Sequence, residues 1–148
     1  METNKKIANM FTNGIENGKS LNMFIEGKTI YSYGFHFPIS KKIKINNNTY
    51  LYLFNNNGYS NTTEKHKSLV LRELKNLNNN IILIGDCNLD NIKPQIKQNN
   101  EKIQENNIKI KRTRTERTFN FYKENTKDLK EQNKFLKDLS LLMELETE

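Results

Sequence analysis

The sequence predicts an α+β fold: a small, mainly antiparallel sheet packed with one or two helices, followed by a long helical C-terminal arm. Several short segments in the first 90 residues are apolar or alternate with a period of two, and Asn- or Gly-containing turns separate them. After about residue 90 the large apolar residues become sparse and recur at helical spacing. We therefore expect a core domain over residues 1–90 and a basic helical arm over residues 91–148.

The core domain begins with a predicted helix and a hairpin. Residues 4–11 have the apolar spacing of a short helix. Residues 21–25 and 28–33 are apolar or β-prone, and Glu26-Gly27 between them predicts a hairpin turn. Pro38 has no N–H to donate to a strand ladder, so its segment should be an edge, a bulge or a turn.

Two further strands and a helix are predicted next. Residues 42–45 and 50–54 have strand periodicity, and Asn46, Asn47 and Asn48 form the turn between them. From Thr62 the apolar period becomes helical, with Asn61 and Glu64 as a capping pair. The apolar face of this helix consists of Leu69, Leu71, Leu74 and Leu77. Residues 78–80 should close the helix, and residues 81–84 should form a short buried strand.

The arm combines a weak amphipathic helix with a second helix that has one apolar stripe. The stripe repeats every seven residues at Tyr122, Leu129, Leu136 and Met143, with Leu139 added. Such a stripe packs back onto the core domain or mediates self-association, and the sequence leaves both open.

The bulk composition limits the classes of protein. A formal net charge of +7 favours a polyanionic partner, although AT-rich codon usage also produces lysine-rich surfaces. The single cysteine, Cys87, excludes an intrachain disulfide and fits a reducing cytoplasm. No apolar run reaches the roughly 18 residues that a membrane span needs. We expect a cytoplasmic protein without a membrane partner.

Two segments, residues 30–40 and 58–68, concentrate Tyr, Ser, Thr and His and contain both histidines, His36 and His66. The second segment begins a predicted helix, whose free N–H groups and positive dipole end attract anions. The predicted anion-binding residues are Ser60, Thr62, Thr63, Lys65, His66 and Lys67. The alternative is an ordinary N-cap followed by solvated lysines.

The first segment offers Tyr31 and Tyr33 for stacking on unpaired bases. Alternatively, Phe35 and Phe37 fill the core and His36 is a hydrogen-bonded structural residue. If the protein is an enzyme, His36 and His66 are the candidates for general acid–base catalysis. Cys87 could be a nucleophile but is more typical of a small core residue, and no compact zinc spacing is present, so we expect neither metal nor cofactor.

The arginine-rich segment of the arm is a third candidate. Lys111, Arg112, Arg114 and Arg117 could bind phosphate or carboxylate oxygens, and on a helix Arg114 and Arg117 share one side with Lys111. The alternative is a solvated, charge-rich helix.

The paired segments also resemble a known family. Tyr31-Ser-Tyr-Gly-x-His-Phe-Pro-Ile39 and Tyr59-Ser-x-Thr-Thr-x-Lys-His66 resemble the paired motifs of small, uncharacterised domains of bacteriophage and mobile-element proteins, over roughly residues 21–75. Ser40 departs from the small apolar residue expected after Pro-Ile. The resemblance implies handling nucleic acid or blocking a host defence such as a CRISPR effector, and it carries over no catalytic residues.

These observations together predict a non-enzymatic accessory protein that binds a host nucleoprotein, or its RNA, in the cytoplasm of an infected bacterium. The alternatives are a direct RNA- or DNA-binding protein and a small histidine-dependent phosphoesterase or nuclease. Self-association through the C-terminal helix also remains open.

Overall fold

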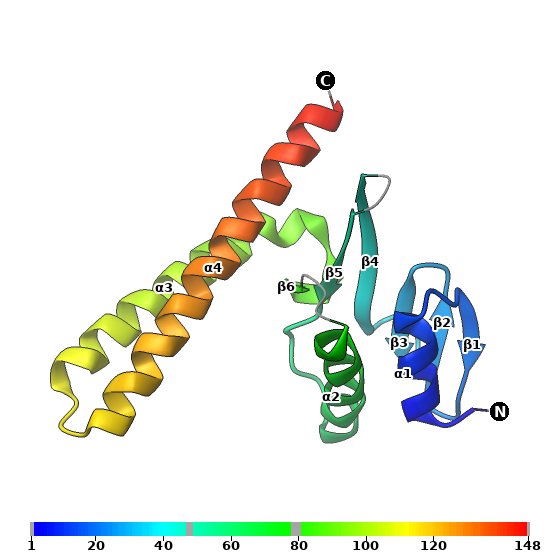
Figure 1. The fold of residues 1–148 in the computed structure, drawn as a ribbon, viewed down its shortest axis with the longest axis horizontal. Helices are drawn as coiled ribbons and strands as arrows, with labels where there is room; N and C mark the ends of the chain where they lie inside the picture. The colour runs from blue at the N-terminus through cyan, green and yellow to red at the C-terminus, as the bar shows by residue number, and fades with distance from the viewer. Residues whose placement is uncertain (1, 47–48, 78–80, 148) are drawn as a thin grey trace. The chain divides into compact units, whose positions relative to one another are not determined.

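The computed structural model describes residues 2–46, 49–77 and 81–147, and it describes no side chain for residues 45, 46, 49 and 142–147. The predicted turns at residues 47–48 and 78–80 therefore lie outside the described residues. The chain divides into two compact units, Met1–Asn88 and Leu89–Glu148. The predicted α+β class is confirmed by a mostly antiparallel sheet, the helices packed on it and a long C-terminal helix (Figure 1).

The first unit is built on a six-stranded sheet in the order β1-β2-β3-β4-β5-β6. Its elements are α1 (Asn4–Thr12), β1 (Asn17–Lys19), β2 (Met23–Glu26), β3 (Thr29–Ser32), β4 (Pro38–Asn46), β5 (Thr49–Phe54), α2 (Asn61–Asn76), β6 (Ile81–Leu83) and the 3-10 turn η1 (Gly85–Cys87). Strands β1 to β5 form an antiparallel meander that includes the predicted hairpin at Glu26-Gly27. The chain then crosses through α2, so β6 pairs with β5 in parallel.

Helices α1 and α2 pack on one face of this sheet. Ile25, Ile30, Ser40 and Phe54 are register partners across β2 to β5, so their side chains share a face. The buried core that includes this face is Ile7, Ala8, Phe11, Met23, Ile25, Ile30, Phe37, Ile39, Tyr52, Phe54, Val70 and Leu74. Ser32 is paired with Met23 on the same face, which places it beneath α2 rather than in solvent.

Two expectations for α2 are wrong. Ser60 caps the helix instead of Asn61: its backbone is extended and its hydroxyl accepts the Thr63 N–H at 3.1 Å. Leu77 is 47% exposed, because the helix ends at Asn76 and the chain turns there. The buried face instead includes the polar residues Thr63, His66 and Lys67 in its first turns.

The second unit is an antiparallel helical hairpin of α3 (Ile92–Arg112) and α4 (Glu116–Thr147), with the short 3-10 turn η2 (Leu89–Asn91) before it. Leu136 and Leu139 of the predicted stripe are buried, and α4 packs against α3. The first predicted helix of the arm was not among the partners expected for this stripe. Met143 lies outside the described side chains.

Buried polar pairs fix how the two helices meet. Asn99 Nδ2 donates to Asn133 Oδ1 at 2.9 Å, and Asn106 Nδ2 donates to Thr126 Oγ1 at 3.2 Å. Asn106 follows Asn99 by seven residues in α3, and Thr126 precedes Asn133 by seven residues in α4. This is the heptad register of an antiparallel coiled coil. A shift of either helix would leave these buried amides without partners, so the polar pairs select one alignment.

Candidate functional site

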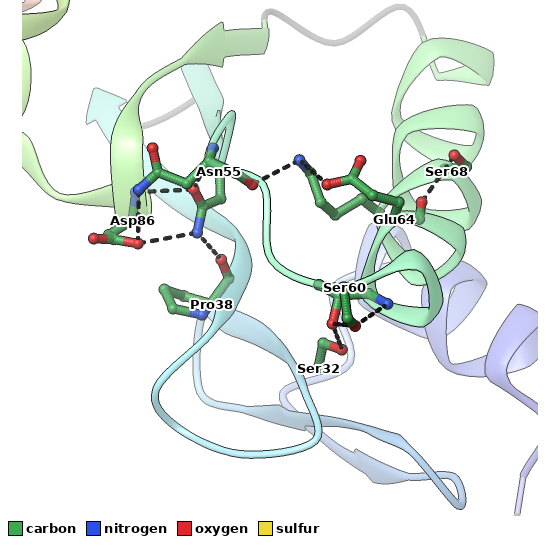
Figure 2. A network of polar contacts seen from close by, with 10 residues as sticks. Ser32, Pro38, Asn55, Ser60, Glu64, Ser68 and Asp86 are labelled. Atoms are coloured by element: carbon green, nitrogen blue, oxygen red, sulfur yellow. Dashed lines mark hydrogen bonds and ion pairs between the residues drawn. The ribbon is translucent and has the colours of Figure 1, made fainter.

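The two histidine-bearing segments meet in the first unit, where the end of β3 lies under the first turns of α2. Ser32 Oγ lies 2.8 Å from His66 Nδ1 and 3.3 Å from Thr63 Oγ1. Ser60 Oγ donates to Thr63 Oγ1 at 3.0 Å. Figure 2 shows Ser32 and Ser60 joined by these dashed contacts. We call Ser60, Thr63, Ser32 and His66 the hydroxyl–imidazole chain.

The hydrogen bonds of the hydroxyl–imidazole chain fit two directions of donation. Ser60 donates to Thr63, and either oxygen of the Thr63–Ser32 pair can donate, so Ser32 either donates to His66 Nδ1 or accepts its proton. Both neutral tautomers of His66 satisfy these contacts. Burial lowers the pKa of His66, which also favours the neutral form. His66 is then an N–H donor at neutral pH and not a cation.

Tyr33 lies beside His66 in an unusual backbone conformation. Gly34 N–H donates to the Ser32 carbonyl at 2.7 Å, which closes a γ-turn around Tyr33 at φ 65°. A non-glycine residue there costs about 1–3 kcal/mol and is enriched at functional sites. The Tyr33 ring is 5.3 Å from the His66 ring and the residue is 50% exposed. This strained turn presents an aromatic surface next to the buried imidazole.

His36 belongs to the same neighbourhood but to its surface. It is exposed, and its ring lies 5.5 Å from that of Tyr59, which precedes the α2 cap. Phe37 is buried in the core, whereas Phe35 is 64% exposed. Of the two phenylalanines considered as core residues, only Phe37 fills that role.

The predicted anion-binding residues separate into buried and exposed members. The Lys67 ammonium is buried and bonded to the Asn57 carbonyl at 3.0 Å and to Glu64 Oε1 at 3.2 Å. Thr63 and His66 are buried, while Lys65, Thr62 and Ser60 are exposed. Lys67 therefore holds the β5–α2 loop to the helix, and the positive charge that reaches solvent in this first turn is that of Lys65.

Tyr31 lies on the sheet face opposite Ser32. Its ring stacks on Phe24 at 4.9 Å, and Phe35 contacts both rings edge-on at 5.1 Å. Tyr31 and Phe24 are half-buried in this cluster. Tyr31 and Tyr33, both predicted to stack on bases, thus have different neighbours: Tyr31 lies in this aromatic cluster, and Tyr33 lies against the His66 ring.

A second polar network, centred on Asn55, was missed from the sequence. Asn55 is fully buried at the end of β5; it donates to the Pro38 carbonyl at 2.8 Å and accepts the Asp86 N–H at 3.0 Å (Figure 2). Asp86 and Cys87 both have positive φ, 55° and 51°. The signal was an Asn run after one strand and Gly85-Asp86 after another, but a run of asparagines is also typical of a plain turn.

Cys87 and the nearby acids do not form a reactive site. Burial, with the Asp86 charge, raises the pKa of the Cys87 thiol to about 12, so the thiolate is not formed near neutral pH. The thiol faces the carbonyls of Ile39 and Leu53 at 3.5 and 3.6 Å. Within the described part of the chain, no three His, Cys, Asp or Glu side chains are grouped as metal ligands.

The second unit gathers the predicted basic residues at its turn. Lys111 and Arg112 end α3, Arg114 lies in the link, and Arg117 is in the first turn of α4. The expectation that Lys111, Arg114 and Arg117 share the side of one helix is wrong. Thr113 is extended and Thr115 Oγ1 accepts the Thr118 N–H, so a new helix begins. We call Lys111, Arg112, Arg114 and Arg117 the basic turn.

The four cations of the basic turn form no ion pair with any residue that the structure describes, although Glu116 lies next to Arg117 in the sequence. Neighbouring Lys109 lies over the Tyr122 ring at 5.4 Å. Three guanidinium groups and an ammonium at one end of a hairpin therefore remain available to an external anion.

Comparisons with known proteins give no relative: no family model, curated protein or solved structure matches the chain. The resemblance to phage domains stays a prediction. No helix among the described residues combines the length and the apolar composition that a bilayer span needs.

Proposed function

We propose that this protein is a non-enzymatic binding protein whose ligand is nucleic acid, either free or as the RNA of a host nucleoprotein. The observation that carries the proposal is the basic turn, in which Arg112, Arg114 and Arg117 lie close in the chain and form no ion pair with the residues that the structure describes.

The chemistry of the basic turn suits phosphate. Each guanidinium presents a planar fork of donors that matches two oxygens of one phosphate. Because the cations are not paired internally, binding does not first have to break an ion pair. If each of the four cations replaces one condensed counterion, log K should fall with log salt at a slope of about 3 to 4.

A histidine-dependent phosphoesterase is the weaker alternative. Ser32 and His66 have the separation of a nucleophile and its base, 2.8 Å. However, Ser32 is 0% exposed and His66 is 3% exposed, so the hydroxyl cannot reach a phosphorus atom without local opening. Their hydrogen bonds instead join α2 to the sheet.

The proposed carrier of the nucleic acid is a host nucleoprotein. The resemblance of residues 21–75 to phage domains supports a nucleoprotein of an infected bacterial cytoplasm, such as a CRISPR effector. Within the first unit, half-exposed Tyr33 and exposed Tyr59 each offer a ring on which an unpaired base could stack.

The test is binding of fluorescein-labelled 20-nucleotide RNA and DNA to the full chain, followed by anisotropy from 50 to 200 mM salt. The variant R112Q/R114Q/R117Q should weaken binding at least tenfold at 100 mM salt and lower the salt slope by about 2 to 3. The matched control K93Q/K97Q/K102Q removes the same charge from the α3 half distant from the turn and should retain most of the affinity. Absence of binding by the unmodified protein at 50 mM salt would refute the proposal.

A further inference from the structure

We infer that the nucleic acid strand lies along α4, in a groove between α3 and α4 lined by Lys123, Lys127, Lys130 and Lys134. This lysine row extends the contact from the basic turn along the hairpin. The inference rests on the proposed function and adds the ligand form: one nucleic acid strand held by its backbone.

The groove is a feature of the second unit alone. It has a volume of about 530 Å³, and Ile110 of α3 and Thr126 of α4 contribute to its lining. Of the charged residues that line it, four are lysines and one, Glu131, is acidic. The groove is therefore positive along its length, with an apolar residue in its wall.

The lysine row follows from helical geometry. Its members are spaced by four, three and four residues, so they fall on one side of α4. At a rise of 1.5 Å per residue, the first and last Cα atoms are about 16 Å apart. Lys123 follows Arg117 of the basic turn by six residues, or about 9 Å of helix. At 100° per residue Arg117 lies about 120° around the helix from Lys123, so the row begins after the basic turn and on another side of α4.

The four lysines of the row are exposed although acidic residues stand near them on α4. Glu131 and Asp138 follow Lys127 and Lys134 by four residues, which is a spacing of helical ion pairs. None of the four lysines nevertheless forms an ion pair with any side chain that the structure describes, and Lys123 lies over the Phe119 ring at 4.9 Å. The exposed ammonium groups therefore remain available to an external anion.

Charge complementarity selects a polyanion with a regular repeat of charges. Lysine is a point charge without the directional fork of arginine, so a row of lysines follows a backbone rather than reading one group. Packed helices lie 8–10 Å apart, and a groove between two of them accepts the backbone of one strand more readily than the width of a duplex. A single nucleic acid strand has a regular repeat of phosphate charges and is narrower than a duplex, so it meets both requirements.

The experiment compares two triple variants of the full chain with equal loss of charge. K127Q/K130Q/K134Q removes three members of the row and keeps Lys123 with its ring contact. K93Q/K97Q/K102Q removes three exposed lysines of α3, of which Lys102 pairs with Glu105 at 3.6 Å. Glutamine preserves helix propensity in both, and far-ultraviolet circular dichroism checks that the helices are retained. Binding of fluorescein-labelled oligo(dT) of 20 nucleotides is measured by anisotropy at 50, 100 and 200 mM salt.

The row variant should lower the salt slope by about 2, because three single-strand phosphate contacts contribute about 0.7 each. Between 50 and 200 mM salt the unmodified protein should consequently lose roughly 20-fold more affinity than the row variant does. The α3 variant should keep the slope of the unmodified protein.

Three outcomes overturn the inference and separate it from the proposed function. If R112Q/R114Q/R117Q weakens binding while the row variant matches the α3 variant, the groove is not used although the basic turn is. If polyglutamate competes as well as oligo(dT) at equal charge, the occupant is an acidic polymer. If a 20-base-pair duplex binds more tightly than the single strand, the one-strand geometry is wrong. Failure of the unmodified protein to bind any nucleic acid would instead refute the proposed function.

Discussion

The substitution S32A tests whether the hydroxyl–imidazole chain joins α2 to the sheet. The Ser32 hydroxyl contacts His66 Nδ1 at 2.8 Å and Thr63 Oγ1 at 3.3 Å. Losing one neutral hydrogen bond costs about 1 kcal/mol, and leaving a buried acceptor without a partner costs about 1–3 kcal/mol. Ser32 is 0% exposed, so water does not readily replace it. We expect a loss of about 2 to 3 kcal/mol in the free energy of unfolding.

The assay for S32A is urea unfolding followed by tyrosine fluorescence. The chain has six tyrosines and no tryptophan, and all tyrosines except Tyr122 lie in the first unit, so the signal reports mainly on that unit. The matched control is S68A on the same helix, whose exposed hydroxyl donates to the Glu64 carbonyl at 3.0 Å. S68A should change stability by less than about 0.5 kcal/mol. If S32A is as stable as S68A, the hydroxyl–imidazole chain does not stabilise the packing of α2 on the sheet.

Two further predictions concern the buried polar groups. Because burial lowers the pKa of His66, the unfolded chain takes up the His66 proton at a higher pH than the folded chain does. The free energy of unfolding is therefore highest above pH 6.5 and falls below it, by at most about 1.4 kcal/mol per pH unit. Urea unfolding at pH 7.5 and 5.5 should show this loss in the unmodified protein and a smaller one in H66Q; equal losses would contradict it. In the hairpin, N133L removes the acceptor of the Asn99 amide and should cost about 1–3 kcal/mol. N99L/N133L should recover only part of this loss, because Asn99 also accepts from Gln95 Nε2 at 3.0 Å. Circular dichroism at 222 nm measures both, and a double variant less stable than N133L would argue against the pairing.

The strands and helices were predictable because their signals are local. The hairpin at Glu26-Gly27 and the period-two segments before Phe54 specify neighbours in sequence that are also neighbours in the sheet. The position of Ser32 under α2 was not predictable, since it depends on a crossover that brings residues 31 to 34 positions apart into contact. Two helices were predicted for the arm, but the position of the break between them, at Thr113–Thr115, was not. The charged residues on either side fit a helix, and the Thr115 cap starts the new one there.

The site residues show the same division between local and distant causes. Both segments were found from their unusual side chains, and their convergence follows from the topology. What sequence spacing could not give is burial. Lys67 and His66 sit beside Lys65 in the chain, yet the helix turns the first two toward the sheet and the third toward solvent. Cations that are neighbours in the sequence are therefore not all exposed to an external ligand.

The same reasoning explains why the hairpin is the better candidate for binding than the histidine segments. In a chain with only 34% apolar residues, polar side chains must complete the interior, and each one used there needs a partner. In the first unit, Ser32, Thr63 and His66 are buried and hydrogen-bonded to one another, so they are not available to a ligand. The second unit takes Asn99, Asn106 and Asn133 instead, neutral residues whose burial leaves every lysine and arginine of α4 outside. By aligning the helices with amides rather than ion pairs, the hairpin keeps its positive charge for an external partner.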